Sequence, residues 1–243
     1  MAQALILGGR SDIGLAFAHI CAHKGYDICL AARRPERLAD DIRDIATRYQ
    51  VQAQACEFDA ENGAGHVAWF SQRDTLPDVV LYAAGYLGDA EQARSDHTEL
   101  ERIMQVNARG AMTILEAAAT AMEKRGSGTI IGISSVAGER GRKSNYHYGA
   151  AKAALTTFLS GLRNRLSGTG IQVITVKPGF VATRMLGGMQ TPAALTATPE
   201  RCAADIFNAM RAGRDVVYST WHWRYVMAVI RNIPERLFKK MSI

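Results

Sequence analysis

The chain contains seven short apolar segments. Most of them are separated by stretches in which apolar residues are spaced as on one face of a helix. Uninterrupted apolar strands that alternate with helical crossovers are typical of a parallel sheet with helices on both faces. The pattern therefore predicts an α/β fold with one doubly wound sheet and a single core. The seven predicted strands are residues 4–7, 26–31, 51–57, 78–83, 129–134, 171–176 and 215–219.

Length and composition fit one domain located in the cytoplasm. The chain has 243 residues, of which 48% are hydrophobic, and this is enough for one large core. The net charge of +6 is spread along the sequence except near the C-terminus, so nucleic-acid binding is not predicted. The four cysteines show no metal spacing, and His19 and His23 lack a third ligand, so we expect reduced thiols and no metal. No signal peptide precedes the first strand, and no apolar run is long enough to span a bilayer.

The carboxyl ends of the strands are where a doubly wound sheet binds its ligands. The first strand runs into GGRSDIG, and a helix follows at once. Small residues let the backbone approach a pyrophosphate there, and the helix N-terminus favours its negative charge. A tight strand-to-helix corner would also need glycines, but the position after the first strand favours a dinucleotide site. The expected contacts in this loop are Gly8, Arg10, Ser11, Ile13 and Gly14.

The second strand ends without the acidic residue that would hold the ribose 2′-hydroxyl of NAD(H). Ala32 stands at this tip, and Arg33 and Arg34 follow it. A 2′-phosphate suits an arginine fork, and the arginine of the glycine-rich loop could face the same phosphate. The sequence therefore favours NADP(H) over NAD(H), although the two arginines could also be solvated loop charges. Asp59, after the third strand, could bind the adenine amino group or cap the helix that begins near Asn62.

The stretch NYHYGAAK begins a helix that is predicted over about 145–166 from its apolar spacing. Tyr148 and Lys152 are four residues apart, so they share one face of this helix. Ser135 lies thirteen residues before Tyr148 at a strand tip, and Asn107 lies in the long helix before that strand. Tyr146 and His147 are not one helical turn from Lys152. We expect them to shape the substrate side or to pack.

These motifs, in this order, resemble the short-chain dehydrogenase/reductase family. The resemblance rests on GxxxxxG after the first strand and on VNARG, ISSVAG, YGAAK and KPGFVAT. It covers nearly the whole chain up to the seventh strand. It implies a single-domain Rossmann fold and an enzyme that moves a hydride between a nicotinamide cofactor and a carbonyl or alcohol.

The resemblance also implies a role for each site residue. Tyr148 would be the general acid/base, and Lys152 would hold the nicotinamide ribose and lower the tyrosine pKa. Ser135 would bind the substrate oxygen, and Asn107 would help to hold a water beside the lysine. A buried tyrosine and a solvated lysine would explain the YxxxK spacing alone. They would not explain why Asn107 and Ser135 also stand at the positions of the family pattern. The cofactor contacts expected from the later strand ends are Ala84, Gly85, Tyr148, Lys152, Pro178, Gly179, Val181 and Thr183.

Two positions depart from the family pattern. Asp12 replaces the middle glycine of the cofactor loop and brings a carboxylate near the pyrophosphate, unless it turns away or caps the helix. The sequence Tyr82-Ala83-Ala84-Gly85 replaces Asn-Asn-Ala-Gly after the fourth strand, so other groups must make the hydrogen bonds of those asparagines. A weaker resemblance, in the GGxS(D/E)IG turn and the basic tail, is to the branch that reduces a keto group on a polyprenyl-phosphate-linked pentose.

The expected activity is the NADP(H)-dependent reduction of a carbonyl, or its reverse. Residues 184–199 stand where the family carries a substrate lid, and their apolar sequence favours a mobile lid and a hydrophobic or lipid-linked substrate. Two other classes stay open: a non-catalytic NADP(H)-binding sensor or subunit, and a membrane-surface protein. The family usually assembles through the helices that bear Asn107 and Tyr148, so the resemblance implies a homodimer or homotetramer.

The Rossmann domain is expected to span residues 1–220, with residues 221–243 as a basic helical extension. Pro234 should divide this tail into two short helices. Five basic residues stand against one acid, and three aromatic residues open the segment. The tail is predicted to pack on its own domain or on a neighbouring subunit; the alternative is contact with the anionic inner face of a membrane. Its predicted apolar stripe is Val226, Ile230, Ile233, Leu237 and Met241.

Overall fold

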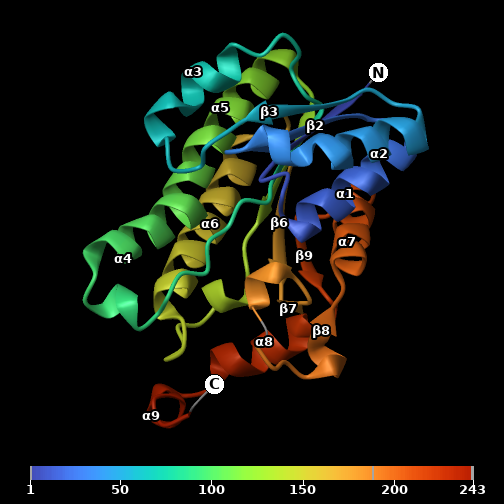
Figure 1. The fold of residues 1–243 in the computed structure, drawn as a ribbon. Coiled ribbons are helices and arrows are strands. Elements are labelled where there is room, and N and C mark those ends of the chain that lie inside the picture. Colours follow the sequence, from blue (N-terminus) through green and yellow to red (C-terminus); the bar gives the residue numbers. More distant parts are fainter. Residues whose placement is uncertain (1, 188, 242–243) are drawn as a thin grey trace.

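A seven-stranded parallel sheet forms the centre of the computed structural model, which describes residues 2–187 and 189–241 (Figure 1). Its strands are β1 (Gln3–Leu7), β2 (Asp27–Ala32), β3 (Ala53–Glu57), β4 (Val79–Tyr82), β5 (Gly128–Ile133), β6 (Ile171–Pro178) and β9 (Val216–Ser219). The strand order is β3-β2-β1-β4-β5-β6-β9, with every pair parallel. This order confirms the predicted Rossmann fold. The order in which strands are added to the sheet reverses between β1 and β4. Three positions of the predicted lid and tail lie outside the described residues: Gly188, Ser242 and Ile243.

Helices cover both faces of the sheet. They are α1 (Asp12–His23), α2 (Ala39–Tyr49), α3 (His66–Ser71), α4 (His97–Met104), α5 (Gly110–Arg125), α6 (Tyr146–Arg165) and α7 (Pro199–Arg211). Successive side chains of a buried strand point to opposite faces, and on β1 Ile6 joins a core with Phe17 of α1. Its neighbour Leu5 joins the opposite core, with Leu115 of α5 and Leu159 of α6. Figure 1 shows α1, α2 and α7 on one side of the sheet and α4, α5 and α6 on the other.

Two features near the carboxyl edge were not predicted. The two-residue strands β7 (Phe180–Val181) and β8 (Thr196–Ala197) pair in parallel, so the lid leaves and returns through a second small sheet. A π-helical turn, η4 (Gln105–Arg109), separates α4 from α5 within the predicted long helix. Strands of two residues are too short to show an alternation. A π turn inserts one residue into a pattern that otherwise stays helical.

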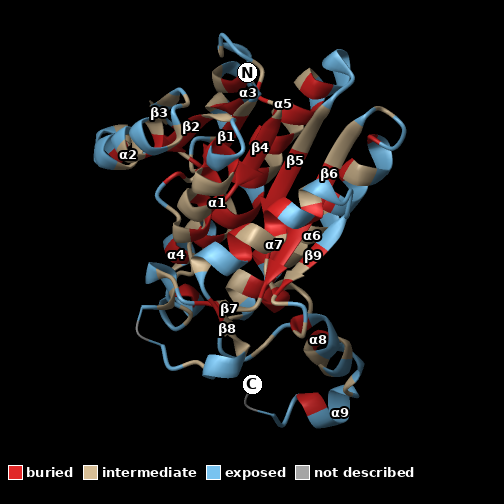
Figure 2. Cartoon of the chain, turned by 90° about the vertical axis from the view of Figure 1, so that its right-hand side faces the viewer, coloured by how far each residue is buried: buried red, intermediate tan, exposed pale blue. Residues whose placement is uncertain are grey.

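The tail forms two helices, α8 (Trp223–Asn232) and α9 (Glu235–Phe238), and Pro234 separates them as predicted. The inner side of α8 packs through Trp223 and Met227 against Val136, which follows the tip of β5. In Figure 2, buried residues of α8 face the body of the molecule, while most of α9 is exposed. None of the helices in the described part of the chain is long and apolar enough to cross a membrane.

The predicted apolar stripe is wrong in its second half. Leu237 and Met241 are 60% and 41% exposed, and Phe238 is the side chain of α9 that is buried. The chain turns at Pro234, so α9 does not continue the face of α8 and packs in another orientation. The Arg140 guanidinium lies 4.0 Å from the centre of the Phe238 ring and covers it.

Candidate active site

The loop between β1 and α1 forms the cofactor end of the site. Gly8 and Gly9 each donate a backbone hydrogen bond of 2.9 Å to the Ala31 carbonyl, which fixes the loop against β2. Gly8 has a φ of +94°, and a β-carbon there would overlap the Ala84 backbone, so only glycine fits. Ile13 lies in the first turn of α1 and is buried. That turn lies at the carboxyl edge of the sheet, where the helix dipole favours an anion.

Asp12 turns away from the helix end and toward Arg184, the first residue of the lid turn η6 (Arg184–Leu186). Its carboxylate accepts hydrogen bonds of 2.8 Å from the Arg184 backbone N–H and from Nε, and Nη2 lies 2.7 Å from Oδ1. The same guanidinium donates to the Arg10 carbonyl. Ser11, and not Asp12, caps α1 by accepting from the Gly14 N–H at 3.4 Å. The lid arginine therefore offsets the negative charge that was expected near the pyrophosphate.

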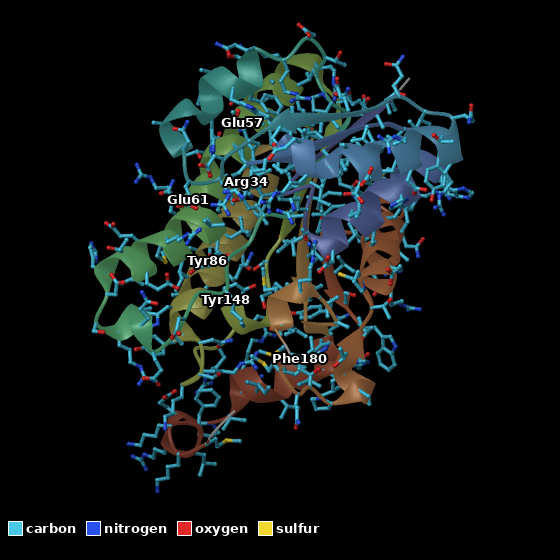
Figure 3. The ribbon with its side chains drawn as sticks, viewed as in Figure 1. Arg34, Glu57, Glu61, Tyr86, Tyr148 and Phe180 are labelled. Carbon is cyan, nitrogen blue, oxygen red and sulfur yellow. The ribbon has the colours of Figure 1, made fainter. Side chains whose placement is uncertain are left out.

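Arg33 and Arg34 follow β2 at the same edge, and both are exposed. Arg33 Nη1 donates to Glu61 Oε1 at 2.9 Å, and Arg102 Nε lies 3.4 Å from the same oxygen. The Arg33 side chain is 59% exposed, so this ion pair is weak and can exchange its partner. Within the described chain the Arg34 side chain forms no ion pair, and Figure 3 shows Arg34 and Glu61 at the cofactor end.

Asp59 forms a turn rather than a helix cap. Its Oδ1 accepts a hydrogen bond of 3.0 Å from the Glu61 N–H, two residues on. Its backbone carbonyl lies 2.9 Å from His66 Nε2. The following short helix, η2 (Gly63–Gly65), starts without a side-chain cap. The capping alternative is therefore wrong, and adenine binding by Asp59 stays a prediction.

Tyr82 and Asn107 make the side-chain hydrogen bonds near the end of β4, where the family pattern has asparagines. The Tyr82 hydroxyl is fully buried and donates to the Val106 carbonyl at 2.6 Å. Burial raises the pKa of Tyr82, so the hydroxyl keeps its proton as a donor. Asn107, in the π turn, donates to the Tyr86 carbonyl, accepts from the Tyr86 N–H at 3.1 Å and donates to the Ile103 carbonyl at 2.9 Å.

Gly85 lies between Asn107 and Lys152. A β-carbon on Gly85 would stand 3.5 Å from Asn107 Oδ1 and 3.9 Å from Lys152 Nζ. Lys152 is 2% exposed and donates from Nζ to the Ile133 carbonyl at 2.8 Å. Burial lowers the pKa of Lys152 to about 7. Ser134 donates to the Lys152 carbonyl at 2.9 Å and so ties the tip of β5 to α6.

The Ser135 side chain lies near the Tyr148 hydroxyl, close enough to lower the pKa of the tyrosine. Ser135 Oγ also accepts from the Ala137 N–H at 3.0 Å, which orients the hydroxyl. Burial raises the pKa of Tyr148 to about 12, against the lowering effect of the nearby Ser135 side chain. Lys152 Nζ lies 5.6 Å from the centre of the Tyr148 ring. In the cofactor-free chain, burial thus disfavours both the phenolate and the ammonium. A lowering of the tyrosine pKa by the charge of Lys152 stays a prediction.

The segment after β6 is where the nicotinamide contacts were expected. Gly179 donates to the Ser219 carbonyl at 2.9 Å, and a β-carbon there would overlap the Trp223 indole. Trp223 packs edge-to-face on Phe180, with ring centres 5.4 Å apart, and donates from Nε1 to the Leu195 carbonyl at 3.1 Å. The sequence pattern did not predict Trp223 at the site. The other expected contacts on this segment are Pro178, buried Val181 and partly buried Thr183.

The family model described as short chain dehydrogenase matches residues 2–193. The chain belongs to the short-chain dehydrogenase/reductase family. It is an oxidoreductase, and membership of this family supports a nicotinamide cofactor.

Relatives and structural neighbours cover nearly the whole chain. The chain is 37% identical to an uncharacterized oxidoreductase of Mycobacterium tuberculosis, over 99% of this chain and 97% of that protein. A short-chain dehydrogenase from Sphingobium yanoikuyae in complex with NADPH superposes with a TM-score of 0.83, 22% identity and 97% coverage of both chains. A 7beta-hydroxysteroid dehydrogenase superposes with a TM-score of 0.84, 21% identity and coverage of 98% and 95%. At these identities the two structures show the fold alone.

The residues of this short-chain dehydrogenase/reductase fit a nicotinamide dinucleotide. A β-carbon at Gly8 would overlap the Ala84 backbone in the loop where the backbone must approach a pyrophosphate. Lys152 Nζ has three N–H groups, of which one is used on the Ile133 carbonyl. Within residues 2–187 and 189–241 the other two have no hydrogen-bond partner, and they suit the hydroxyls of a ribose.

A buried ion pair beneath the strand ends was also missed. Lys177 Nζ lies 2.6 Å from Glu139 Oε1, and the two side chains are 11% and 3% exposed. The Tyr218 hydroxyl donates to the same oxygen. These contacts join the loop after Ser135 to the ends of β6 and β9. No spacing pattern indicates that two charges 38 positions apart will meet.

Proposed function

We propose that this oxidoreductase uses NADPH to reduce a carbonyl to an alcohol, or catalyses the reverse. The observation that supports it most is that the Ser135 and Tyr148 side chains lie close together beside buried Lys152. A bound nicotinamide would supply or accept the hydride. Ser135 donates a hydrogen bond to the substrate oxygen, and Tyr148 gives its proton to that oxygen during reduction. A tyrosine with a raised pKa keeps this proton at neutral pH.

Lys152 and Asn107 support the proton donor. With a pKa of about 7, Lys152 gains and loses a proton readily at neutral pH, so it can return a proton to Tyr148 after each turnover. Its two remaining N–H groups hold the ribose. Asn107 binds both the N–H and the carbonyl of Tyr86 and so fixes the strand end on which Gly85 lies.

The preference for NADP(H) over NAD(H) is supported by the charges after β2. Ala32 leaves the strand tip without an acid, and Arg33 and Arg34 follow it. A 2′-phosphate carries about −1.5 to −2 charges and competes for the Arg33 guanidinium against the single charge of Glu61. The Sphingobium yanoikuyae neighbour was solved in complex with NADPH, which agrees with this preference.

The substrate class that we propose is an apolar carbonyl compound, including lipid-linked ones. Met185 and Met189 of the lid are exposed apolar side chains, and Phe180 lies at the base of the lid. A β-carbon on Gly85 would stand 3.2 Å from Met185 Cε, so the lid reaches the catalytic groups. From the family resemblance we also propose a homodimer or homotetramer in the cytoplasm.

The test is a screen of carbonyl compounds with NADPH and with NADH, followed as loss of cofactor absorbance. It should include steroids, acyl chains, quinones and keto sugars on lipid carriers. We expect turnover of at least one apolar ketone, faster with NADPH than with NADH. A protein that binds NADPH but turns over no compound would favour the non-catalytic sensor, against which the intact Ser135, Tyr148 and Lys152 stand.

A further inference from the structure

The tail has a second apolar face, which points to solvent. Trp221, Tyr225 and Val229 are spaced by four residues, so they lie on one side of α8 and the turn before it. Their exposed fractions are 67%, 62% and 67%. The Trp221 and Tyr225 rings lie edge-to-face with centres 5.9 Å apart. Since α8 packs inward through Trp223 and Met227, the helix is apolar on two sides and only one is covered by the described chain.

The second helix of the tail extends this surface with Leu237 and Met241. Three further apolar side chains are exposed near Tyr148 in the sequence or on the predicted lid: Tyr146, Met185 and Met189. Figures 1 and 2 both show α8 and α9 at the same end of the molecule as β7 and β8. Exposed apolar surface is thus concentrated at the end that holds the site, which marks an interaction surface. We name as the outer face Trp221, Tyr225, Val229, Leu237 and Met241.

Positive charge borders the outer face. The one acid of the tail, Glu235, lies 2.7 Å from Arg140 and is neutralised by it. The basic residues of the tail are Arg224, Arg231, Arg236, Lys239 and Lys240. A hollow of about 230 Å³ between α9 and the loop before α6 is lined by Arg142, Lys143, Glu235, Phe238, Lys239 and Met241. This hollow combines cationic and apolar walls, as a lipid headgroup and its adjoining chain require.

A second copy of the chain is a poor partner for this surface. A two-fold interface places the same patch against itself, so the basic borders of two copies would meet and repel. The surface of an anionic bilayer fits both features, since aromatic and aliphatic side chains enter the acyl boundary while Lys and Arg face the phosphates. We propose that α8 and α9 bind the surface of a bilayer that contains anionic lipids.

The contact would bring the bilayer next to the substrate lid. Trp223, on the inner side of α8, touches Phe180, which precedes the lid, and hydrogen-bonds the carbonyl of Leu195, which lies within the lid. A substrate that is itself a membrane lipid with a carbonyl group can then enter from the bilayer. This last step, and only this step, rests on the proposed function.

The experiment is sedimentation of the full-length protein with sucrose-loaded vesicles. Vesicles of phosphatidylcholine alone are compared with vesicles that also contain phosphatidylglycerol, at low and high salt. We expect binding to the anionic vesicles that weakens in high salt. Point variants are preferable to a truncation after Thr220, because a truncation would also remove the buried Trp223 beside Gly179.

Two variants and a control separate the apolar and basic contributions. The combined change Trp221→Ser, Tyr225→Ser and Val229→Ser removes apolar contacts from the outer face. The combined change Arg236→Gln, Lys239→Gln and Lys240→Gln removes basic charge. Each should weaken anionic-vesicle binding roughly tenfold or more. The control is Val67→Ser combined with Lys124→Gln. It alters one exposed apolar residue and one basic residue, on α3 and α5, away from the tail (Figure 1). This variant should bind vesicles as the wild type does.

Four results would overturn the proposal. The first is no vesicle binding by folded full-length protein, and the second is binding by both variants that equals that of the wild type. The third is release by inorganic phosphate at constant ionic strength, and the fourth is an oligomer that dissociates in the outer-face variant without vesicle binding. Phosphate release would mean a free-phosphate site, and dissociation would mean a subunit interface. The assay contains neither cofactor nor substrate, so its failure leaves carbonyl reduction untested, and a failed carbonyl screen leaves vesicle binding intact.

Discussion

Asp12 and Arg184 are 172 positions apart in the sequence and form an ion pair of 2.7 Å across the mouth of the cofactor site. The pair joins the first residue of α1 to the first residue of the lid turn. Asp12 occupies a position where the family pattern has glycine. We interpret Arg184 as the residue that makes this carboxylate compatible with a pyrophosphate, since its guanidinium offsets the charge.

Removing the arginine should expose this charge to the cofactor. We expect Arg184→Ala to weaken NADPH binding roughly tenfold, because the Asp12 carboxylate then repels the pyrophosphate. In an Asp12→Gly background the same change should cost less than about threefold, and Asp12→Gly alone should not weaken binding. Fluorescence titration of the four proteins gives the coupling energy. Equal losses in both backgrounds would show that Arg184 does not act through Asp12.

The tyrosine at the centre of the proposed mechanism has a matched control two residues away. Tyr148→Phe removes the proton donor and little volume, so kcat should fall by roughly 10²–10⁴ while NADPH binding stays within a few-fold. Tyr146→Phe alters a side chain that is 43% exposed and should be mild. Steady-state kinetics and cofactor titration check both. Activity of Tyr148→Phe within a few-fold of wild type would contradict the assignment.

The proposed phosphate contact predicts opposite effects for Arg33 and its carboxylate partner. Arg33→Ala should weaken NADPH binding by about 1.5–3 kcal/mol, roughly ten- to a hundredfold, and NADH binding much less. Glu61→Gln releases Arg33 from its 2.9 Å ion pair and should strengthen NADPH binding. The ratio of the two dissociation constants is the measurement. If both cofactors weaken equally in Arg33→Ala, the side chain does not read the phosphate.

Lys152 should make the cofactor-free enzyme less stable at low pH. Burial lowers its pKa from 10.5 to about 7, so between these values the unfolded chain binds a proton that the folded chain does not. The free energy of unfolding should therefore rise with pH between about 7 and 10.5. Below about pH 7 the destabilisation from burying Lys152 is complete. Lys152→Met removes the cost and should be more stable by up to about 5 kcal/mol near pH 6, with a difference that vanishes above about pH 10.5. Urea unfolding at several pH values is the check, and a difference that grows with pH would contradict it.

Local spacing made the fold and the reacting groups predictable. Tyr148 and Lys152 are one helical turn apart, and Ser135 ends a strand whose apolar run is clear, so topology brings them together. The effect of burial on the pKa of Tyr148 was not predictable, because it depends on packing that spacing does not show. Adenine binding by Asp59, the NADP(H) preference and the oligomer stay predictions.

Contacts between distant loops were not predictable. The pairs Asp12 with Arg184 and Glu139 with Lys177 join charges from distant segments of the chain, and no periodic pattern relates such positions. The tail shows the same limit. Its sequence has apolar residues on several sides, and only the packing of Trp223 decides which side faces the body.

The two tail tryptophans provide the last prediction, because one is buried and the other is exposed. Trp223 is 3% exposed and fills the space above Gly179, whereas Trp221 is 67% exposed. Trp223→Ala should cost about 3–5 kcal/mol of unfolding free energy, since it leaves a cavity and removes the hydrogen bond to the Leu195 carbonyl. Trp221→Ala should change stability by less than about 0.5 kcal/mol.

The same comparison tests whether the tail supports the site. Phe180 loses its aromatic partner in Trp223→Ala, so kcat/KM should fall even at a temperature where the variant is fully folded. Trp223→Phe keeps a ring against Phe180 and should recover part of the activity, while Trp221→Ala should retain all of it. Urea unfolding and steady-state kinetics on the three variants separate stability from positioning. If folded Trp223→Ala turns over substrate as well as Trp221→Ala does, the packing of α8 beneath the lid has no part in catalysis.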